Sequence, residues 1–350
     1  MAQRPKGEKR WEQYVGLDVS QKETVICVID GNGKQVWEGV CSSTPEAIAA
    51  VLHRKAPLAV KIGMETGPLA VWHWHELRRA GLPVVCLHAR HAKAALSVQL
   101  NKTDANDAFG LAQIVRTGWY REVEVKSLES HALRLLLAGR ARLVSMRTTL
   151  YSQIRGLLKT FGVVLQAGKG GTFERLVIKG VPADRHVKLV IESLMATWRH
   201  LTLELRKFDR EISKISSTNP TCRRLMTLPG VGPITALAYL TTVDEPRRFA
   251  RSKDVGAYLG LTPRRYQSGE VDHSGRISKC GDRMTRSLLV EAAGVLLCRN
   301  KRASVLKSWG LKLRRRVGFA KARVAVARKL AVLMHRMWIH EMVFQSNPAT

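Results

Sequence analysis

Tyr14-Val-Gly-Leu-Asp18-Val is the stretch that decides the fold of the first part of this chain, because it reads as a short apolar strand that reaches an acid near its end. The turn signal Gly31-Asn-Gly33 predicts a hairpin between the two segments that flank it. The other predicted strands are residues 24–30, 34–40, 59–64 and 82–87, and the predicted helices between them are residues 45–52 and 71–80. Strands that alternate with helices predict an α/β domain, in which helices cover a central sheet.

The middle of the chain changes to a helical pattern. Leucines and valines recur on common faces over residues 128–161, and a second helical stretch covers residues 186–215. The Gly-rich segment 162–180 between them is interpreted as a loop. Two long helices around a loop predict an antiparallel helical hairpin or coiled coil.

A third part begins near Asn219-Pro220. Leu228-Pro-Gly230-Val-Gly232-Pro precedes an apolar helical stretch and resembles the turn of a helix-hairpin-helix, whose glycines let backbone N–H groups approach a DNA phosphate. An ordinary turn between two helices remains the alternative. The resulting domain hypothesis is an α/β domain at 1–127, a helical linker or oligomerisation region at 128–218, a third domain at 219–340 and a tail at 341–350.

Charge is the most informative property of the composition. The 350 residues carry a formal net charge of +30, of which residues 1–127 contribute +4, residues 128–246 contribute +9 and residues 247–336 contribute +18. A chain this basic favours a polyanionic partner, first of all nucleic acid, over a small-molecule substrate. Carboxylate chemistry is expected in the front half, and polyanion binding behind it.

Other classes of protein are disfavoured. No apolar run reaches the roughly 18 residues of a membrane span, and residues 1–10 lack the apolar core of a secretory signal. The six cysteines form no CxxC pair, which argues against a disulfide framework and a structural zinc site. We therefore expect a cytoplasmic protein with no membrane partner.

Four acids occupy positions suited to a metal site. Asp18 and Glu65 end the first and third apolar strands, and Asp104 and Asp107 open a helix after the candidate cap Thr103. Spacing i, i+3 puts the last two on one helix face. Carboxylates gathered together need cations, and hard oxygen ligands suit Mg²⁺ or Mn²⁺ in phosphoryl transfer. Each acid singly could be a turn or helix-dipole residue.

Several motifs in one order now support a resemblance. They are Tyr14-Val-Gly-Leu-Asp18-Val-Ser-Gln-Lys, Met64-Glu65-Thr-Gly, Asn101-Lys-Thr-Asp104-Ala-Asn-Asp107-Ala, Leu228-Pro-Gly-Val-Gly232, Leu259-Gly-Leu-Thr-Pro-Arg264-Arg-Tyr-Gln-Ser268-Gly and Gly275-Arg-Ile-Ser-Lys279-Cys-Gly-Asp-Arg283. From about residue 14 to 335 the chain resembles the DEDD-type insertion-sequence transposases of the "IS one-ten" family, relatives of the Piv DNA invertase.

The resemblance implies a RuvC-like (RNase H-like) N-terminal domain, a helical coiled-coil linker and a mainly α C-terminal transposase domain. It implies recombination of donor and target double-stranded DNA, guided by a structured bridge RNA, by a homo-oligomer (dimer to tetramer) in which the acids of one subunit meet the serine of another. By motif, the catalytic acids and metal ligands are Asp18, Glu65, Asp104 and Asp107, and the nucleophile is Ser268. The role of segment 162–180 stays open.

Ser268 is placed in a basic loop between helical stretches. Without the resemblance, Ser274 and an inert turn serine compete equally with it for this role. A serine hydroxyl needs activation by a base or metal, and Arg264, Arg265 and Arg276 could neutralise charge on the phosphate. Tyr266 is interpreted as a packing or stacking residue. Other expected nucleic-acid contacts are Lys102, Gly230, Gly232, Lys279, Arg283, Arg314, Arg315 and Arg316, together with the basic helix 321–336.

The leading hypothesis is therefore a serine-using, Mg²⁺-dependent, RNA-guided DNA transposase. Two alternatives are weighed against it. A hydrolytic RuvC-like nuclease of the junction-resolvase type would need the four acids and no serine. A non-enzymatic nucleic-acid-binding protein would tolerate loss of Asp18 or Asp104.

Overall fold

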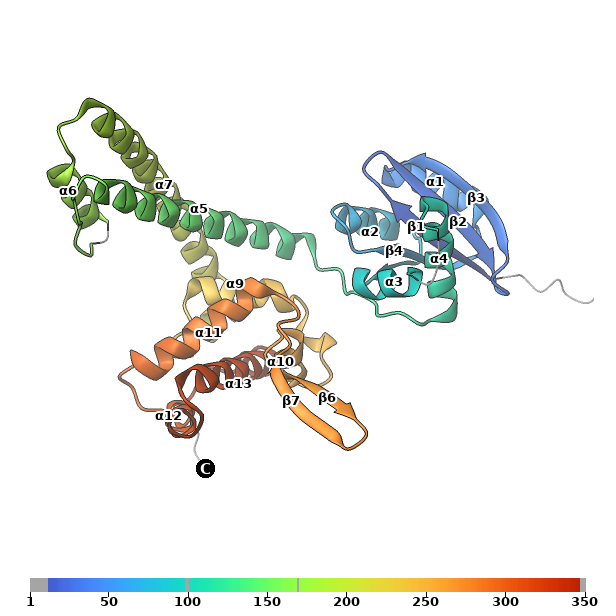
Figure 1. Ribbon diagram of the computed structural model, residues 1–350. Coiled ribbons are helices and arrows are strands. Elements are labelled where there is room, and N and C mark those ends of the chain that lie inside the picture. The colour runs from blue at the N-terminus through green and yellow to red at the C-terminus, as the bar shows by residue number, and fades with distance from the viewer. Residues whose placement is uncertain (1–11, 98–100, 169, 347–350) are drawn as a thin grey trace, which may run out of the picture. The chain divides into compact units, whose positions relative to one another are not determined.

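The predicted first strand lies at the centre of a five-stranded sheet in the order β3-β2-β1-β4-β5 (Figure 1). Its strands are β1 (Gln13–Val19), β2 (Glu23–Asp30), β3 (Gln35–Ser42), β4 (Ala59–Glu65) and β5 (Val84–Leu87). β1, β2 and β3 are antiparallel neighbours, whereas β4 and β5 run parallel to β1. The computed structural model describes residues 12–97, 101–168 and 170–346.

Helices cover both faces of this sheet. They are α1 (Pro45–Lys55), α2 (Ala70–Arg79), α3 (Ala89–Leu96) and α4 (Asp104–Thr117). α1 and α2 bury Leu52 and Leu77 against the β1 face of Val15 and Leu17. α4 covers the other face, because side chains of a strand alternate between faces and Gly16 leaves room there. This unit extends to Lys126.

The second compact unit begins at Ser127 with two long helices. α5 (Leu128–Lys159) and α7 (Arg185–Thr218) run antiparallel, as predicted, and Arg140 pairs with Asp209 at 2.6 Å between them. The interpretation of 162–180 as a loop is wrong in its second half, because α6 (Gly171–Gly180) forms there. Buried Phe173 packs against Trp198, so tertiary contact stabilises a helix that the glycines disguise in the sequence.

The rest of this unit is mainly helical, and its core is built around buried Tyr239, whose hydroxyl donates to the Ala331 carbonyl at 2.7 Å. Its elements are α8 (Pro220–Leu225), α9 (Pro233–Val243), the 3-10 helix η1 (Pro246–Arg248), α10 (Asp254–Tyr258), β6 (Pro263–Ser268), β7 (Val271–Ile277), α11 (Arg283–Cys298), α12 (Val305–Val317) and α13 (Phe319–Ile339). The predicted fold class is confirmed in outline: the first part is α/β and the rest is mainly helical. α8 and α9 are joined by the turn that contains Gly230 and Gly232.

Polar contacts join the start of α5 to this helical core. Ser127 caps α5 and donates from its hydroxyl to Asp244 at 2.8 Å, and Arg134 pairs with Asp282 and donates to Thr242 at 2.7 Å. Because these contacts sit at the N-terminal end of α5, the long helical arm is anchored to the core at that end. Nowhere in the described parts of the chain is a helix long and apolar enough to cross a membrane.

Candidate functional site

Two of the four predicted acids come together at one edge of the sheet. β1 and β4 are parallel neighbours with Leu17 opposite Met64, so Asp18 and Glu65, which follow these residues, extend from the same edge. Both side chains are half-buried and line a cleft of about 200 Å³. The C-terminal ends of parallel strands are a common place for ligand sites, because loops leave the sheet there.

α4 brings the other two acids to this edge. Thr103 caps the helix by accepting from the Asn106 N–H at 3.2 Å, which puts Asp104 and Asp107 in its first turn. The helix can lie on β1 because residue 16 is glycine: a Cβ there would stand 1.9 Å from the Ala108 carbonyl oxygen.

The charges of this cluster act on one another. Burial, followed by the negative charges of Asp104 and Asp107, raises the pKa of Asp18 above its ordinary 3.8. Burial, followed by Asp18 and Asp107, raises the pKa of Glu65 above 4.5. Lys102 opposes both shifts, so the structure places this predicted nucleic-acid contact beside the carboxylates, where it partly neutralises them.

The donor set suits a hard divalent cation, since it consists of carboxylate oxygens with mutually repelling charges. In the residues that the structure describes, no group of three or more His, Cys, Asp or Glu side chains is arranged to hold a metal ion. The cluster is thus close enough for electrostatic coupling, but its side chains would have to converge further to coordinate a metal.

Ser268 lies in the second unit, at the tip of an exposed β-hairpin. The expectation that it sits in a loop between helical stretches is wrong, because it ends β6 and pairs with Val271 of β7. Gly269 (φ +55°) begins the turn between the strands. The hairpin is missed in the sequence because every residue of β6 is exposed, so no alternation of apolar and polar residues marks the strand.

The pairing places the two candidate serines on opposite faces of the hairpin. Tyr266 lies opposite His273, and their rings stack at 5.2 Å. Ser268 shares the Tyr266 face, because residues i and i+2 of a strand point to the same side. Ser274 lies opposite Arg265 on the other face. Arg265 pairs with Asp272 at 2.5 Å there, and Arg264 donates to the Ser278 carbonyl at 3.2 Å.

The base of the hairpin is held by two glycine-containing motifs that interlock. A Cβ on Gly260 would lie 2.3 Å from the Cys280 carbonyl oxygen, and one on Gly281 would lie 2.0 Å from that of Tyr258. Arg286 donates to the carbonyls of Leu259 (3.1 Å) and Cys280 (2.7 Å). This backbone-to-backbone packing gives a structural reason for glycines at these positions.

The remaining predicted DNA contacts lie elsewhere in the second unit. Gly230 (φ +90°) packs on α11, where a Cβ would meet the Ala292 carbonyl oxygen at 2.4 Å, while Gly232 caps α9 with open space around it. Arg283 begins α11 and is exposed. The triplet Arg314–Arg316 ends α12, where cations also favour the helix dipole.

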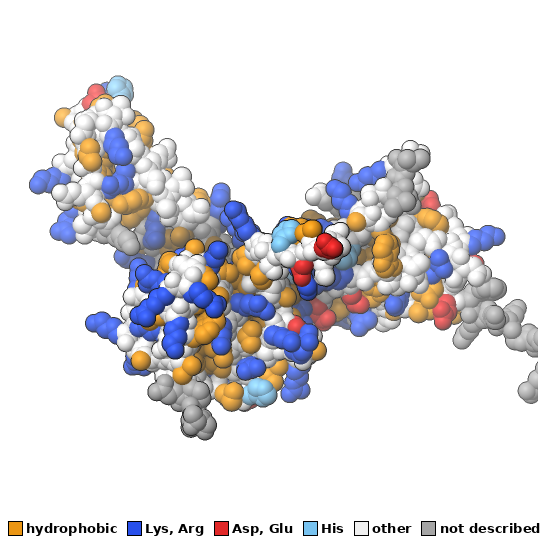
Figure 2. Space-filling model, turned by 60° about the horizontal axis from the view of Figure 1, so that its bottom comes forward, with side chains coloured by type: hydrophobic (Ala, Val, Ile, Leu, Met, Phe, Trp, Pro, Cys, Tyr) orange, Lys and Arg blue, Asp and Glu red, His pale blue; other side chains and the backbone are white. Residues whose placement is uncertain are grey.

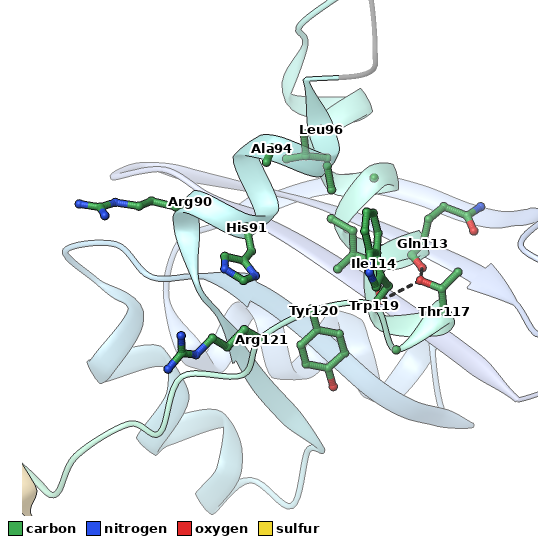
Figure 3. A pocket seen from close by; sticks show the side chains of 13 residues that line it. Arg90, His91, Ala94, Leu96, Gln113, Ile114, Thr117, Trp119, Tyr120 and Arg121 are labelled. Atoms are coloured by element: carbon green, nitrogen blue, oxygen red, sulfur yellow. Dashed lines mark hydrogen bonds between the residues drawn. The ribbon is translucent and has the colours of Figure 1, made fainter. Parts of the chain in front are cut away.

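A pocket in the first unit has no counterpart in the sequence interpretation. It measures about 870 Å³ and lies between α3, α4 and the segment after α4. Figure 3 shows Arg90, His91 and Arg121 at one end and Trp119 with Ile114 at the other. Trp119 is 81% exposed. The Gly118-Trp119-Tyr120 sequence, a helix-ending glycine followed by aromatics, is the signal that could have indicated it.

Comparisons with known proteins bear on both units. A family model described as "Transposase" (DEDD_Tnp_IS110) matches residues 15–162, and one described as "Transposase IS116/IS110/IS902 family" matches residues 222–307. The transposase for insertion sequence element IS1111A of Coxiella burnetii is 30% identical over 331 residues, which cover 92% of this chain and 88% of that one. A "Probable family 20 transposase" of Pseudomonas aeruginosa is 29% identical over 290 residues, covering 81% and 85%.

The fold and these matches define a DEDD-type transposase whose first domain is an α/β unit built on a mixed five-stranded sheet. The chain belongs to the IS116/IS110/IS902 family of transposases. Among solved structures, Thermus thermophilus RuvC matches with 14% identity and a TM-score of 0.25, covering 32% of this chain and 100% of that one. The two family models and the IS1111A relative confirm the resemblance inferred from the ordered motifs.

Proposed function

We propose that this transposase cuts and rejoins double-stranded donor and target DNA through a covalent phosphoserine link at Ser268. The observation that carries the proposal is the position of Ser268 at an exposed hairpin tip, on the face opposite Ser274. Its side chain is exposed, so it is open to a phosphodiester and to a base that activates it.

In the proposed reaction, Ser268 Oγ loses its proton to a base and attacks a phosphodiester phosphorus. The P–O bond to one strand breaks, and the departing oxygen takes up a proton to become a free hydroxyl. A hydroxyl of another strand then attacks the phosphoserine, which rejoins DNA and restores the serine. Arg264 and Arg276 would neutralise charge on the phosphate. Because the bond count is unchanged, no ATP is needed.

Asp18, Glu65, Asp104 and Asp107 would hold Mg²⁺ or Mn²⁺ in this proposal. The pKa values of Asp18 and Glu65, raised first by burial and then by neighbouring carboxylates, support it, because a bound cation would offset both the burial of charge and the repulsion. Such a cation, when bound, lowers the pKa of an attacking hydroxyl and stabilises charge on phosphate oxygens.

We further propose that a structured bridge RNA guides the reaction and that the protein acts as a homo-oligomer, dimer to tetramer. The net charge of +30 supports binding of both DNA and RNA. The exposed serine supports an arrangement in which the acids of one subunit serve the serine of another, as the family resemblance implies.

The test is a covalent adduct between protein and labelled DNA that survives a denaturing gel. The reaction contains full-length protein, Mg²⁺, RNA transcribed from the DNA flanking the gene, and donor and target DNA. We expect wild type and Ser274→Ala to form the adduct, and Ser268→Ala and Asp18→Asn to lose it. Equal yields of nicked DNA from wild type and Ser268→Ala would instead establish a hydrolytic nuclease.

A further inference from the structure

A groove in the second unit lies between the hairpin and α13. It has a volume of about 1180 Å³ and is bounded by residues 274–277 of β7 on one side. Its other wall is a face of α13 on which residues recur three, four or seven positions apart. Nothing in the proposed reaction yet accounts for this groove.

The walls of the groove carry only positive charge. Cations on the hairpin side and along α13 are Arg276, Lys279, Lys321, Arg328, Lys329 and Arg336. No carboxylate lines the groove, and none of these six cations is paired with a carboxylate, in the part of the chain that the structure describes. Unpaired cations that face one another repel unless a polyanion lies between them.

The floor of the groove is apolar. Leu261, Ile277, Trp309, Val324, Val332 and Leu333 contribute to it, and Lys329 lies 4.8 Å from the centre of the Trp309 ring. Figure 2 shows the same combination on the surface of the second unit, where Lys and Arg side chains surround patches of hydrophobic ones.

We propose that this groove binds a single strand of DNA during strand exchange, with phosphates on the cationic walls and unpaired bases on the apolar floor. A duplex turns its phosphates outward and keeps the flat faces of its bases stacked inside, so it has no apolar surface to offer the floor. A single strand offers both, and grooves that combine cations with aromatic or apolar platforms suit it.

The hairpin connects this groove to the serine, which favours DNA over RNA. β7 forms a wall of the groove at Ser274 and reaches the partner of Ser268, Val271, three residues away, or about 10 Å along a strand. A strand in the groove therefore runs along the hairpin toward its tip, which it must pass to reach Ser268 on the opposite face. The assignment to DNA rests on the proposed function, since only the DNA is cut there.

The test measures binding without chemistry, by fluorescence anisotropy of labelled 12-nucleotide DNA. All binding is measured in EDTA with full-length protein that carries Ser268→Ala. The groove variant carries Lys321→Gln and Arg328→Gln in addition. The control is Lys188→Gln/Lys214→Gln, which removes two exposed cations from α7, away from the groove. Duplex DNA and an RNA of the same sequence and length serve as competing ligands.

We expect the groove variant to lose more affinity for single-stranded DNA than for the duplex or the RNA, which the proposed function binds elsewhere on the protein. The groove variant should weaken the binding of single-stranded DNA about 25-fold at 0.1 M salt and reduce the salt slope by about 1.4, because each single-strand phosphate contact contributes about 0.7 to the slope. The control variant should leave both the affinity for single-stranded DNA and the salt slope close to those of the Ser268→Ala protein.

Equal losses in the groove and control variants, or a groove loss restricted to duplex, would overturn the proposal. A larger loss of affinity for RNA than for single-stranded DNA in the groove variant would overturn the assignment to DNA. Since Ser268→Ala protein in EDTA forms no adduct, any of these results leaves the test of the phosphoserine mechanism separate.

Discussion

Gly16 of β1 lies directly against Ala108 of α4, so closely that a Cβ at position 16 would stand 1.9 Å from the Ala108 carbonyl oxygen. The contact joins the strand that ends with Asp18 to the helix that begins with Asp104 and Asp107. Backbone packing without a side chain between them therefore sets how far the acids of the strand lie from those of the helix.

Replacement of Gly16 tests this contact. Gly16→Ala should push α4 away from β1, lower the free energy of unfolding by about 1–3 kcal/mol as overpacked cores do, and reduce adduct formation. Urea unfolding and the adduct gel measure the two effects. Gly31→Ala is the matched control, because a Cβ there meets nothing nearer than 3.9 Å. Wild-type activity in Gly16→Ala would show that the helix need not lie so close.

The acid cluster predicts a gain in stability when it loses charge. The pKa values of Asp18 and Glu65 are raised in the folded chain, so their ionisation destabilises it, and the stability present below their ordinary values of 3.8 and 4.5 is lost as pH rises through the raised values. Asp18→Asn/Glu65→Gln should therefore raise Tm relative to wild type at pH 7 and abolish adduct formation.

The difference in Tm should shrink as pH falls to 4, and Mg²⁺ should raise the Tm of the wild type but not of the double variant. Thermal melts between pH 4 and 8 measure it. Glu23→Gln, an exposed acid outside the cluster, is the control. A double variant less stable than wild type at pH 7 would contradict the repulsion on which the proposed metal site rests.

The ion pair of Arg134 and Asp282 predicts the opposite pH dependence. Burial acts to raise the pKa of Asp282, but the Thr285 backbone N–H and Arg134 outweigh it and lower the pKa below 3.8. Its stabilisation is thus present at neutral pH and is lost as pH falls below 3.8 through the lowered value.

Asp282→Ala should lower the free energy of unfolding at pH 7 by about 2 kcal/mol. This is less than the roughly 3–5 kcal/mol for a fully buried pair, because the side chains of Arg134 and Asp282 keep 24% and 16% exposure. Asp209→Ala, which breaks the more exposed pair with Arg140, should cost less than about 1 kcal/mol. Urea unfolding measures the loss of unfolding free energy in both variants. Equal losses would show that the pair of Arg134 and Asp282 is no more stabilising than the exposed pair of Arg140 and Asp209.

The hairpin base provides a further prediction. Gly281→Ala should reduce adduct formation strongly, because its Cβ would collide with the Tyr258 carbonyl oxygen and displace the hairpin that carries Ser268. The Mg²⁺-induced rise in Tm, which reports on the acid cluster, should persist. A Cβ at Gly269 would meet no neighbouring atom, so Gly269→Ala suffers only from its positive φ, which costs about 1–2 kcal/mol. This variant should therefore form more adduct than Gly281→Ala. More adduct from Gly281→Ala than from Gly269→Ala would show that the packing at the foot of the hairpin does not position Ser268.

Much of the first unit could be predicted because its signals are local. The strands around Asp18 and Glu65 are apolar and buried, so periodicity and turn residues mark them. The hairpin from Pro263 to Ile277 could not be found this way, since nearly all of its residues are exposed and its few apolar residues do not alternate with polar ones. α6 was missed because Phe173 is buried by side chains from α5 and α7, far away in sequence.

By itself the sequence determined the family, the α/β class of the first part and the residue types of the candidate site, because motif order, periodicity and charge are properties of the chain read locally. Tertiary structure alone decided that Asp18, Glu65, Asp104 and Asp107 act on one another's charges, that Ser268 and Ser274 face opposite ways, and that cations of β7 and α13 enclose an apolar floor. Those relationships depend on strand register and on backbone contacts such as Gly16 with Ala108, which join residues far apart in the chain.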